Sequence, residues 1–419
     1  MSGSAGPIRF PLPAVLGLLF LSGATLSAIA SDFVHLSLPK HRILADELAI
    51  IINDADPLSI RIGNYYRKAR NIPARNVLHV DFKPGRPGMG KAEFQRIKTR
   101  INRQTPAAVQ AYAITWAAPY RVGCMSITSA FAFDFDERFC SKQRCAPTRH
   151  SAYFRRPSAT PYTDYAIRPT IAIAAENFAA ARALIDRGVR SDQTRPSGTA
   201  YLVSTSDKAR NVRSRGYSTV ERRMAGWINT RVVESEALKN TSDILFYFTG
   251  KVSVPYLDTL QFVPGAIADH LTSAGGRLTG SRQMSALRWL EAGATGSYGT
   301  VVEPCNLTGK FPNPGVLMDL YGSGRTLLQA YWQSVQQPGE GIFIGEPLAA
   351  PFDGFSLENT GDSILLTTRT LLPGRYQLTY SQGPVGPYRV MPGVIKVAYH
   401  QRRLALPNAG PGYYRLEPL

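Results

Sequence analysis

Near the N-terminal end of the chain the sequence predicts a strand, a capped helix and a second strand in direct succession. Residues 48–52 (LAIII) form an uninterrupted apolar run rich in β-branched residues, which is typical of a buried strand. Asp56 and Pro57 then supply an N-cap and a first helical residue, and residues 76–82 (NVLHVDF) predict the next strand. Two strands joined through a helix form a crossover unit, so the chain is expected to fold around a parallel sheet.

The same alternation continues as far as residues 342–344. Further segments with the pattern of strands or helices are the strands 109–116, 171–175, 200–204, 244–248, 296–302 and 342–344 and the helices 91–104, 178–187, 283–292 and 326–335. Residues 117–168 lack this pattern and are expected to form a long loop. The predicted fold class is therefore α/β, with a mostly parallel sheet flanked by helices.

The pattern changes after residue 352. Apolar and polar residues alternate over 363–368, 374–380 and 394–399, and Pro-Gly turns separate these segments. Such short alternating segments predict antiparallel strands. We expect an α/β domain over residues 31–352 and a C-terminal antiparallel β-sandwich domain over 353–419.

The first 30 residues have the features of a secretory signal peptide. Arg9 precedes a mostly apolar run over residues 12–28, and Ala28-Ile29-Ala30 matches an A-x-A cleavage site. We expect this segment to direct export to the periplasm, the cell envelope or the medium, with cleavage between Ala30 and Ser31. Beyond this segment the sequence predicts no transmembrane anchor.

The four cysteines, Cys124, Cys140, Cys145 and Cys305, are therefore expected in an oxidising compartment. Four cysteines allow two disulfides in three connectivities. One of these joins Cys140 to Cys145 in a short loop and leaves Cys124 to pair with Cys305. The sequence does not decide among the three, and any disulfide at Cys305 competes with a catalytic role for it.

The chain is basic, with 48 Lys and Arg against 30 Asp and Glu and a formal net charge of +18. This charge favours solubility and attraction to polyanions. Seven basic residues concentrate between residues 207 and 231: Lys208, Arg210, Arg213, Arg215, Arg222, Arg223 and Arg231. We expect a solvated helix face there, with a polyanion site as the alternative. No module for specific nucleic-acid binding is recognisable, so the candidate partners are a polyanion or a protein of the cell envelope.

Residues 248–352 hold the candidate chemistry, because small residues and acids follow predicted strand ends there. His270 and Cys305 could form a catalytic dyad, in which the histidine activates the thiol and Asp258 orients the histidine. Asp269 and Glu303 are alternative orienting acids. The competing interpretation is that Cys305 forms a disulfide and His270 is a structural hydrogen-bonding residue.

No cofactor or metal site is predicted. The six histidines show no metal-ligand spacing, and the TSAGG turn lacks the Lys-Ser/Thr of a phosphate-binding loop. Asp134, Asp136 and Glu137 form a local acidic group that could bind a cation or basic side chains. We expect a solvated loop at this position.

Four long segments resemble an uncharacterised family of exported bacterial proteins with no assigned activity. They are YYRKARNIPARNVLHVDF, LDTLQFVPGAIADHLTSAGG, MSALRWLEAGATGSYGTVVEPCN and QAYWQSV…GEPLAAPF. This resemblance extends over most of the chain after residue 30, and it implies kinship without implying a function.

A more distant resemblance is to gingipain-type cysteine peptidases. The shared order is a strand ending in Thr249-Gly250, a strand reading GATGSYGTVV, a helix, a Gly-Glu-Pro turn and a β-sandwich. It implies a caspase-like or flavodoxin-like sheet. Those peptidases carry a histidine in a Gly-His-Gly motif, where this chain has Lys251, and their cysteine follows the next strand, whereas Cys305 follows GATGSYGTVV. The expected function is a non-catalytic or degenerate caspase/gingipain-like domain of the cell envelope, with a cysteine hydrolase and a polyanion-binding module as alternatives.

Overall fold

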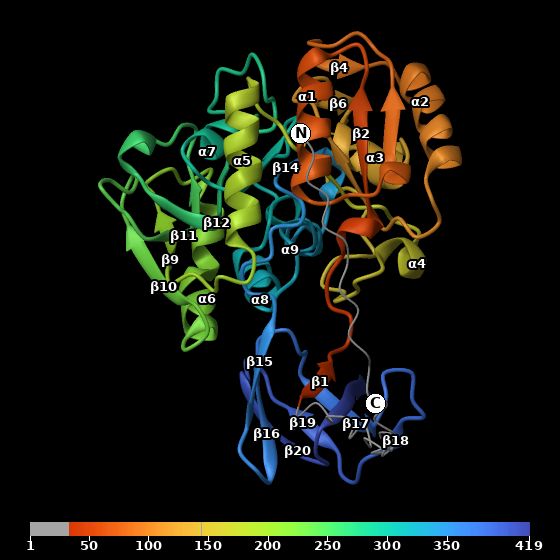
Figure 1. The fold of residues 1–419 in the computed structure, drawn as a ribbon. Coiled ribbons are helices and arrows are strands. Elements are labelled where there is room, and N and C mark those ends of the chain that lie inside the picture. The colour runs from red at the N-terminus through yellow and green to blue at the C-terminus, as the bar shows by residue number, and fades with distance from the viewer. Residues whose placement is uncertain (1–32, 144) are drawn as a thin grey trace, which may run out of the picture.

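A ten-stranded sheet is the largest element of the computed structural model, which describes residues 33–143 and 145–419 (Figure 1). Its strand order is β10-β9-β11-β12-β13-β14-β8-β5-β2-β3. The strands are β2 (Leu48–Asn53), β3 (Val77–Val80), β5 (Ala111–Ile114), β8 (Thr170–Ala172), β9 (Thr199–Ser204), β10 (Asn229–Glu234), β11 (Ile244–Gly250), β12 (Phe262–Leu271), β13 (Gly296–Thr300) and β14 (Gly341–Gly345). The predicted α/β fold with a mostly parallel sheet is confirmed.

This sheet consists of two parallel blocks that run in opposite directions. All neighbouring strands pair in parallel except β13 and β14, which pair antiparallel. The carboxyl ends of β9 to β13 therefore lie at the opposite edge from those of β2, β3, β5, β8 and β14. Within the block of β9 to β13 the chain order reverses between β9 and β11, and ligands of open α/β sheets bind at such a point.

The helices form where local sequence signals favour them. Asp56 accepts a hydrogen bond from the Leu58 N–H at 2.9 Å, and Pro57 begins α1. On one side of the sheet α1 packs against α5 through Tyr65 and Phe178, whose ring centroids lie 5.8 Å apart. The helices are α1 (Pro57–Ala69), α2 (Lys91–Gln104), α3 (Ile127–Phe133), α4 (Pro161–Tyr165), α5 (Phe178–Ser191), α6 (Tyr217–Met224), α7 (Leu287–Glu291), α8 (Pro314–Gly322) and α9 (Leu327–Ser334).

Residues 117–168 are not the continuous loop that the sequence predicted. They contain α3, α4 and the short strands β6 (Arg121–Val122) and β7 (Met125–Ser126), which form a small sheet with β4 (Gly88–Met89). Phe131 of α3 packs edge-on against Phe94 of α2, with ring centroids 5.2 Å apart. Tertiary packing of this kind stabilises a helix that is too short to be predicted from local sequence.

The C-terminal strands form two further small sheets with a shared apolar core. One sheet has the order β1-β21-β17-β18 with β19 beside β17, and the other has the order β15-β16-β20. These strands are β1 (Val34–Ser37), β15 (Phe355–Asn359), β16 (Ser363–Thr368), β17 (Gly374–Ser381), β18 (Arg389–Val390), β19 (Ile395–Val397), β20 (Arg403–Pro407) and β21 (Gly412–Pro418). Leu366 and Leu404 of one sheet and Leu378 and Leu416 of the other belong to the same buried cluster.

The first described strand belongs to this C-terminal part. β1 pairs in parallel with β21, and Figure 1 shows the red β1 among the blue C-terminal strands. The sequence prediction places residues 31–352 in the α/β domain. β1 lies within that range, but it pairs with β21 in a C-terminal sheet.

The predicted signal peptide, residues 1–30, lies outside the described residues. Among the residues that the structure describes, no helix has the length and apolar character needed to span a membrane.

Candidate functional site

Cys305 is bonded to Cys145, and Cys124 is bonded to Cys140. All four cysteines of the chain are therefore paired. This connectivity differs from the one that joins Cys140 to Cys145 and Cys124 to Cys305. Because the nucleophile of a cysteine enzyme is the thiolate, a disulfide-bonded Cys305 lacks the group that the predicted dyad requires.

His270 lies near the end of β12 and is almost completely buried, with 1% of its surface exposed. Its Nδ1 accepts a hydrogen bond from Trp289 Nε1 at 2.9 Å, and its Nε2 lies 3.2 Å from the Met284 carbonyl oxygen. Burial lowers the pKa of His270 to about 3. The histidine is therefore neutral near pH 7 and both ring nitrogens are engaged, which matches the structural role considered as the alternative to catalysis.

None of the three candidate acids orients His270. Asp258 lies in the 3-10 helix η5 (Leu257–Thr259) and is exposed. Asp269 neighbours His270 on β12 and so points to the opposite face of the sheet, and Glu303 accepts a hydrogen bond from the Cys305 N–H at 2.8 Å. The structure therefore does not assemble Asp258, His270 and Cys305 into a triad.

The crevice between β9 and β11 is filled by the chain itself. Thr205, just after β9, donates to the Gly250 carbonyl oxygen at 2.7 Å, and Asn211 donates to the Thr205 carbonyl oxygen at 2.7 Å. A Cβ atom at Gly250 would lie only 1.9 Å from the Arg210 carbonyl oxygen. Gly250 thus permits the 3-10 helix η4 (Asn211–Gly216) to approach the sheet at the place where open α/β sheets in general bind ligands.

η4 also directs a charged side chain into the core. Arg213 Nη2 lies 2.7 Å from Asp269 Oδ1 and donates to the Thr249 carbonyl oxygen at 2.7 Å. Both side chains of this ion pair are almost completely buried. Burial raises the pKa of Asp269, and the charge of Arg213 opposes this rise. The prediction of a solvated basic face is therefore wrong at Arg213, because a carboxylate distant in the sequence pairs with it inside the protein.

A pocket of about 280 Å³ lies beside this ion pair, and it is the candidate site. Arg213 and Tyr217 line it together with the aromatic rings of Phe154 and Phe311. Arg213 Nε and the Tyr217 hydroxyl are buried without a hydrogen-bond partner among the described residues, as is Asp269 Oδ2 behind them. Buried polar atoms are normally satisfied, so these three atoms, in two residues that line the pocket and in the carboxylate paired with one of them, mark a place where an ordered water molecule or a small polar group would be stabilised.

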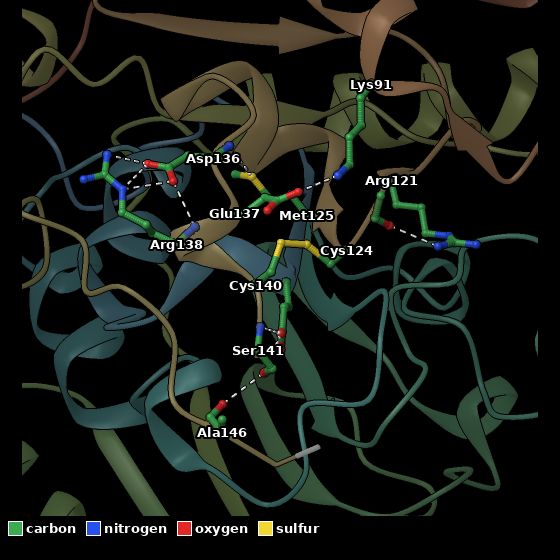
Figure 2. Close-up of a disulfide and its surroundings, with 12 residues drawn as sticks. Lys91, Arg121, Cys124, Met125, Asp136, Glu137, Arg138, Cys140, Ser141 and Ala146 are labelled. Atoms are coloured by element: carbon green, nitrogen blue, oxygen red, sulfur yellow. Dashed lines mark hydrogen bonds and ion pairs between the residues drawn. A yellow bond between two sulfur atoms is a disulfide. The ribbon is translucent and has the colours of Figure 1, made fainter. Parts of the chain in front are cut away.

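Asp136 and Glu137 of the predicted acidic group lie near the Cys124–Cys140 disulfide (Figure 2). Asp136 lies 2.7 Å from Arg138 Nη2 and 3.2 Å from Arg149 Nη1, and Glu137 lies 2.6 Å from Lys91 Nζ. Asp134 in turn pairs with Lys98, with 3.2 Å between Oδ1 and Nζ. The side chains that bind these carboxylates are therefore basic ones. Within residues 33–143 and 145–419, no cluster of His, Cys, Asp and Glu has an arrangement suited to a metal ion.

The comparisons with known proteins found similarity among solved structures. No family model matches the chain, and no curated protein matches it. A crystal structure of the Arg-specific cysteine proteinase gingipain R (RgpB) is 8% identical, with a TM-score of 0.44 over 88% of this chain and 98% of that one. A complex of the pro- and mature domains of RgpB from Porphyromonas gingivalis is 9% identical, with a TM-score of 0.38 over 87% and 94% of the two chains.

A further solved structure, described as a protease, is 10% identical to this chain, with a TM-score of 0.37. The match covers 86% of this chain and 96% of that one. Two of these three solved structures are gingipains, the peptidases that the sequence distantly resembles.

Proposed function

We propose that this chain is a non-catalytic, exported ligand-binding protein of the cell envelope, built on a degenerate caspase/gingipain-like domain. The observation that carries the proposal is the Cys145–Cys305 disulfide, which occupies the only cysteine considered as a nucleophile. The contacts of His270 with Trp289 and Met284 support it further, because they leave no ring nitrogen available to accept a proton. The proposal includes cleavage after Ala30 and a C-terminal β-sandwich, which the shared core of the two small sheets supports.

The ligand site of this proposal is the pocket beside Arg213. Asp269 neutralises the charge of Arg213, so the pocket favours an uncharged ligand over an ion. Arg213 Nε and the Tyr217 hydroxyl can hydrogen-bond such a ligand, and Phe154 and Phe311 supply apolar surface. A volume of about 280 Å³ suits a single small molecule. We expect a neutral molecule with several hydroxyl or amide groups, such as a monosaccharide.

Titration calorimetry with N-acetylglucosamine, which carries both hydroxyl and amide groups, tests the ligand class. Tyr217→Phe removes one hydroxyl and keeps the ring, so affinity is expected to fall about tenfold. Tyr413→Phe on β21 is the matched control and should bind like the wild type. No binding by the wild type, or equal binding by Tyr217→Phe, would contradict the proposed site.

An assay with fluorogenic peptides, with and without a thiol reductant, tests the absence of catalysis. We expect no turnover in either condition. Turnover in reductant that is abolished by Cys305→Ser and retained by Cys124→Ser would establish the cysteine hydrolase instead.

A further inference from the structure

A second and larger pocket, of about 900 Å³, lies between the ten-stranded sheet and the C-terminal sheets. The α/β part contributes residues that precede β9, β10 and β11, which places the pocket at the amino edge of these strands. The C-terminal part contributes the end of β16 and the residue before β20. Arg195, Trp227, Asp243, Arg369 and Arg402 are among the residues that line the pocket. None of the residues that line this pocket lines the one beside Arg213.

Two of the three arginines in this pocket are held side by side. Arg369 Nη2 and Arg402 Nη2 each donate to the Trp227 carbonyl oxygen at 3.0 Å. Their Cζ atoms lie 4.3 Å and 5.1 Å from the centroid of the Trp227 ring. The shared carbonyl and ring fix both guanidinium groups at the pocket wall, so they are oriented before any ligand binds.

The positive charge of this pocket is not balanced by the described residues. None of Arg195, Arg369 and Arg402 forms an ion pair with another residue that the structure describes. Asp243 lines the pocket, but it accepts hydrogen bonds from the hydroxyls of Thr199 at 2.6 Å and Tyr201 at 2.7 Å. Three guanidinium groups and one carboxylate leave two positive charges in excess.

This arrangement destabilises the charged form of Arg369. Burial, followed by the charges of Arg402 and Arg195, lowers the pKa of Arg369 to about 10. Its Nη1 is buried and has no partner among the described residues. A cation kept close to like charges, with a buried donor unused, is stabilised when an anion binds beside it.

We infer that this pocket binds the phosphate group of an organic phosphomonoester. A phosphate dianion matches the excess of two positive charges, and guanidinium groups bind its oxygens through pairs of parallel hydrogen bonds. A volume of about 900 Å³ is near the upper end for pockets that hold drug-sized ligands, so the phosphate belongs to a larger molecule. Because both parts of the chain line the pocket, the ligand would connect the α/β part to the C-terminal sheets.

Titration calorimetry at constant ionic strength tests this inference with three probes: glycerol 3-phosphate, inorganic phosphate and acetate. We expect glycerol 3-phosphate to bind more tightly than inorganic phosphate, and acetate to bind more weakly than either. Equal affinities for the two phosphates would overturn the organic part of the inference. Acetate binding as tight as phosphate binding would overturn the phosphate assignment.

Variants of the arginines locate the site. Arg195→Gln changes an exposed side chain that makes no hydrogen bond in the described part of the chain, so the fold should be retained. Affinity for glycerol 3-phosphate is expected to fall about tenfold in Arg195→Gln and by more in Arg369→Gln. Arg222→Gln, on α6 outside the pocket, is the matched control. Unchanged affinity in both pocket variants, or an equal loss in Arg222→Gln, would overturn the site.

Discussion

Trp289 donates its indole N–H to Nδ1 of His270 at 2.9 Å, and this contact determines the state of the histidine. With Nδ1 acting as the acceptor, the ring hydrogen resides on Nε2 and points to the Met284 carbonyl oxygen at 3.2 Å. The imidazole thus connects β12 to the segment around Met284 and α7. A neutral imidazole with both nitrogens engaged stabilises the fold and cannot serve as a general base.

This state of His270 predicts how stability depends on pH. The pKa of His270 is about 3 in the folded protein and about 6.5 in an unfolded chain. Below pH 6.5 the unfolded chain binds a proton that the folded protein excludes. The contribution of His270 to the free energy of unfolding is therefore complete above pH 6.5 and is lost as the pH falls toward 3. Between pH 7 and pH 5, proton binding by His270 in the unfolded chain lowers the free energy of unfolding by about 2 kcal/mol.

Urea unfolding at both pH values checks this expectation. His270→Gln should reduce the difference in unfolding free energy between pH 7 and pH 5 by about this amount. His150→Gln, at an exposed position, serves as the control and should retain the wild-type difference. If His270→Gln has the same pH dependence as the wild type, His270 does not exclude a proton as described.

The buried ion pair between Arg213 and Asp269 predicts an asymmetry between single and double substitutions. Asp269→Asn leaves an unpaired charge in the core, so the free energy of unfolding should fall by about 3–5 kcal/mol. The double variant Arg213→Met/Asp269→Leu removes both charges and should recover most of that loss. Urea unfolding measures both. If the double variant is no more stable than Asp269→Asn, the loss in unfolding free energy does not come from an unpaired charge.

Most strands of the ten-stranded sheet and most of the helices around it could be predicted, because the sequence signals that favour them are local. The apolar run of residues 48–52 and the Asp56 cap require no information from distant residues. β12 was not predicted, since Pro264 and Gly265 within it are typical of a turn. Gly265 has a φ of 86°, and pairing with β11 and β13 on either side stabilises the strand across this irregularity.

The site was less predictable because tertiary partners create it. Arg213 resembles the other basic residues of its segment, and only the position of Asp269 in the fold explains why it is buried. The disulfide pairing could not be derived from the spacing of the cysteines. In the same way, the pairing of β1 with β21 joins residues from opposite ends of the described chain, and no local pattern predicts it.

The two disulfides are expected to stabilise the protein to different extents. Cys145 and Cys305 are separated by 160 residues, whereas Cys124 and Cys140 are separated by 16. In the chain-entropy view, the longer loop contributes about 5 kcal/mol and the shorter one about 3 kcal/mol. Replacing both cysteines of a pair by serine avoids unpaired thiols. Urea unfolding should therefore show the larger loss for Cys145→Ser/Cys305→Ser, and the reverse order would contradict the entropic account.

Alkylation of the native, unreduced protein with iodoacetamide shows directly whether Cys305 carries a free thiol. Peptide mass spectrometry then identifies any modified cysteine. We expect no modified cysteine, and a non-reducing digest should contain Cys145 and Cys305 in one linked pair of peptides. Alkylation of Cys305 in the native protein would show that the Cys145–Cys305 disulfide is absent and that Cys305 is available as a nucleophile.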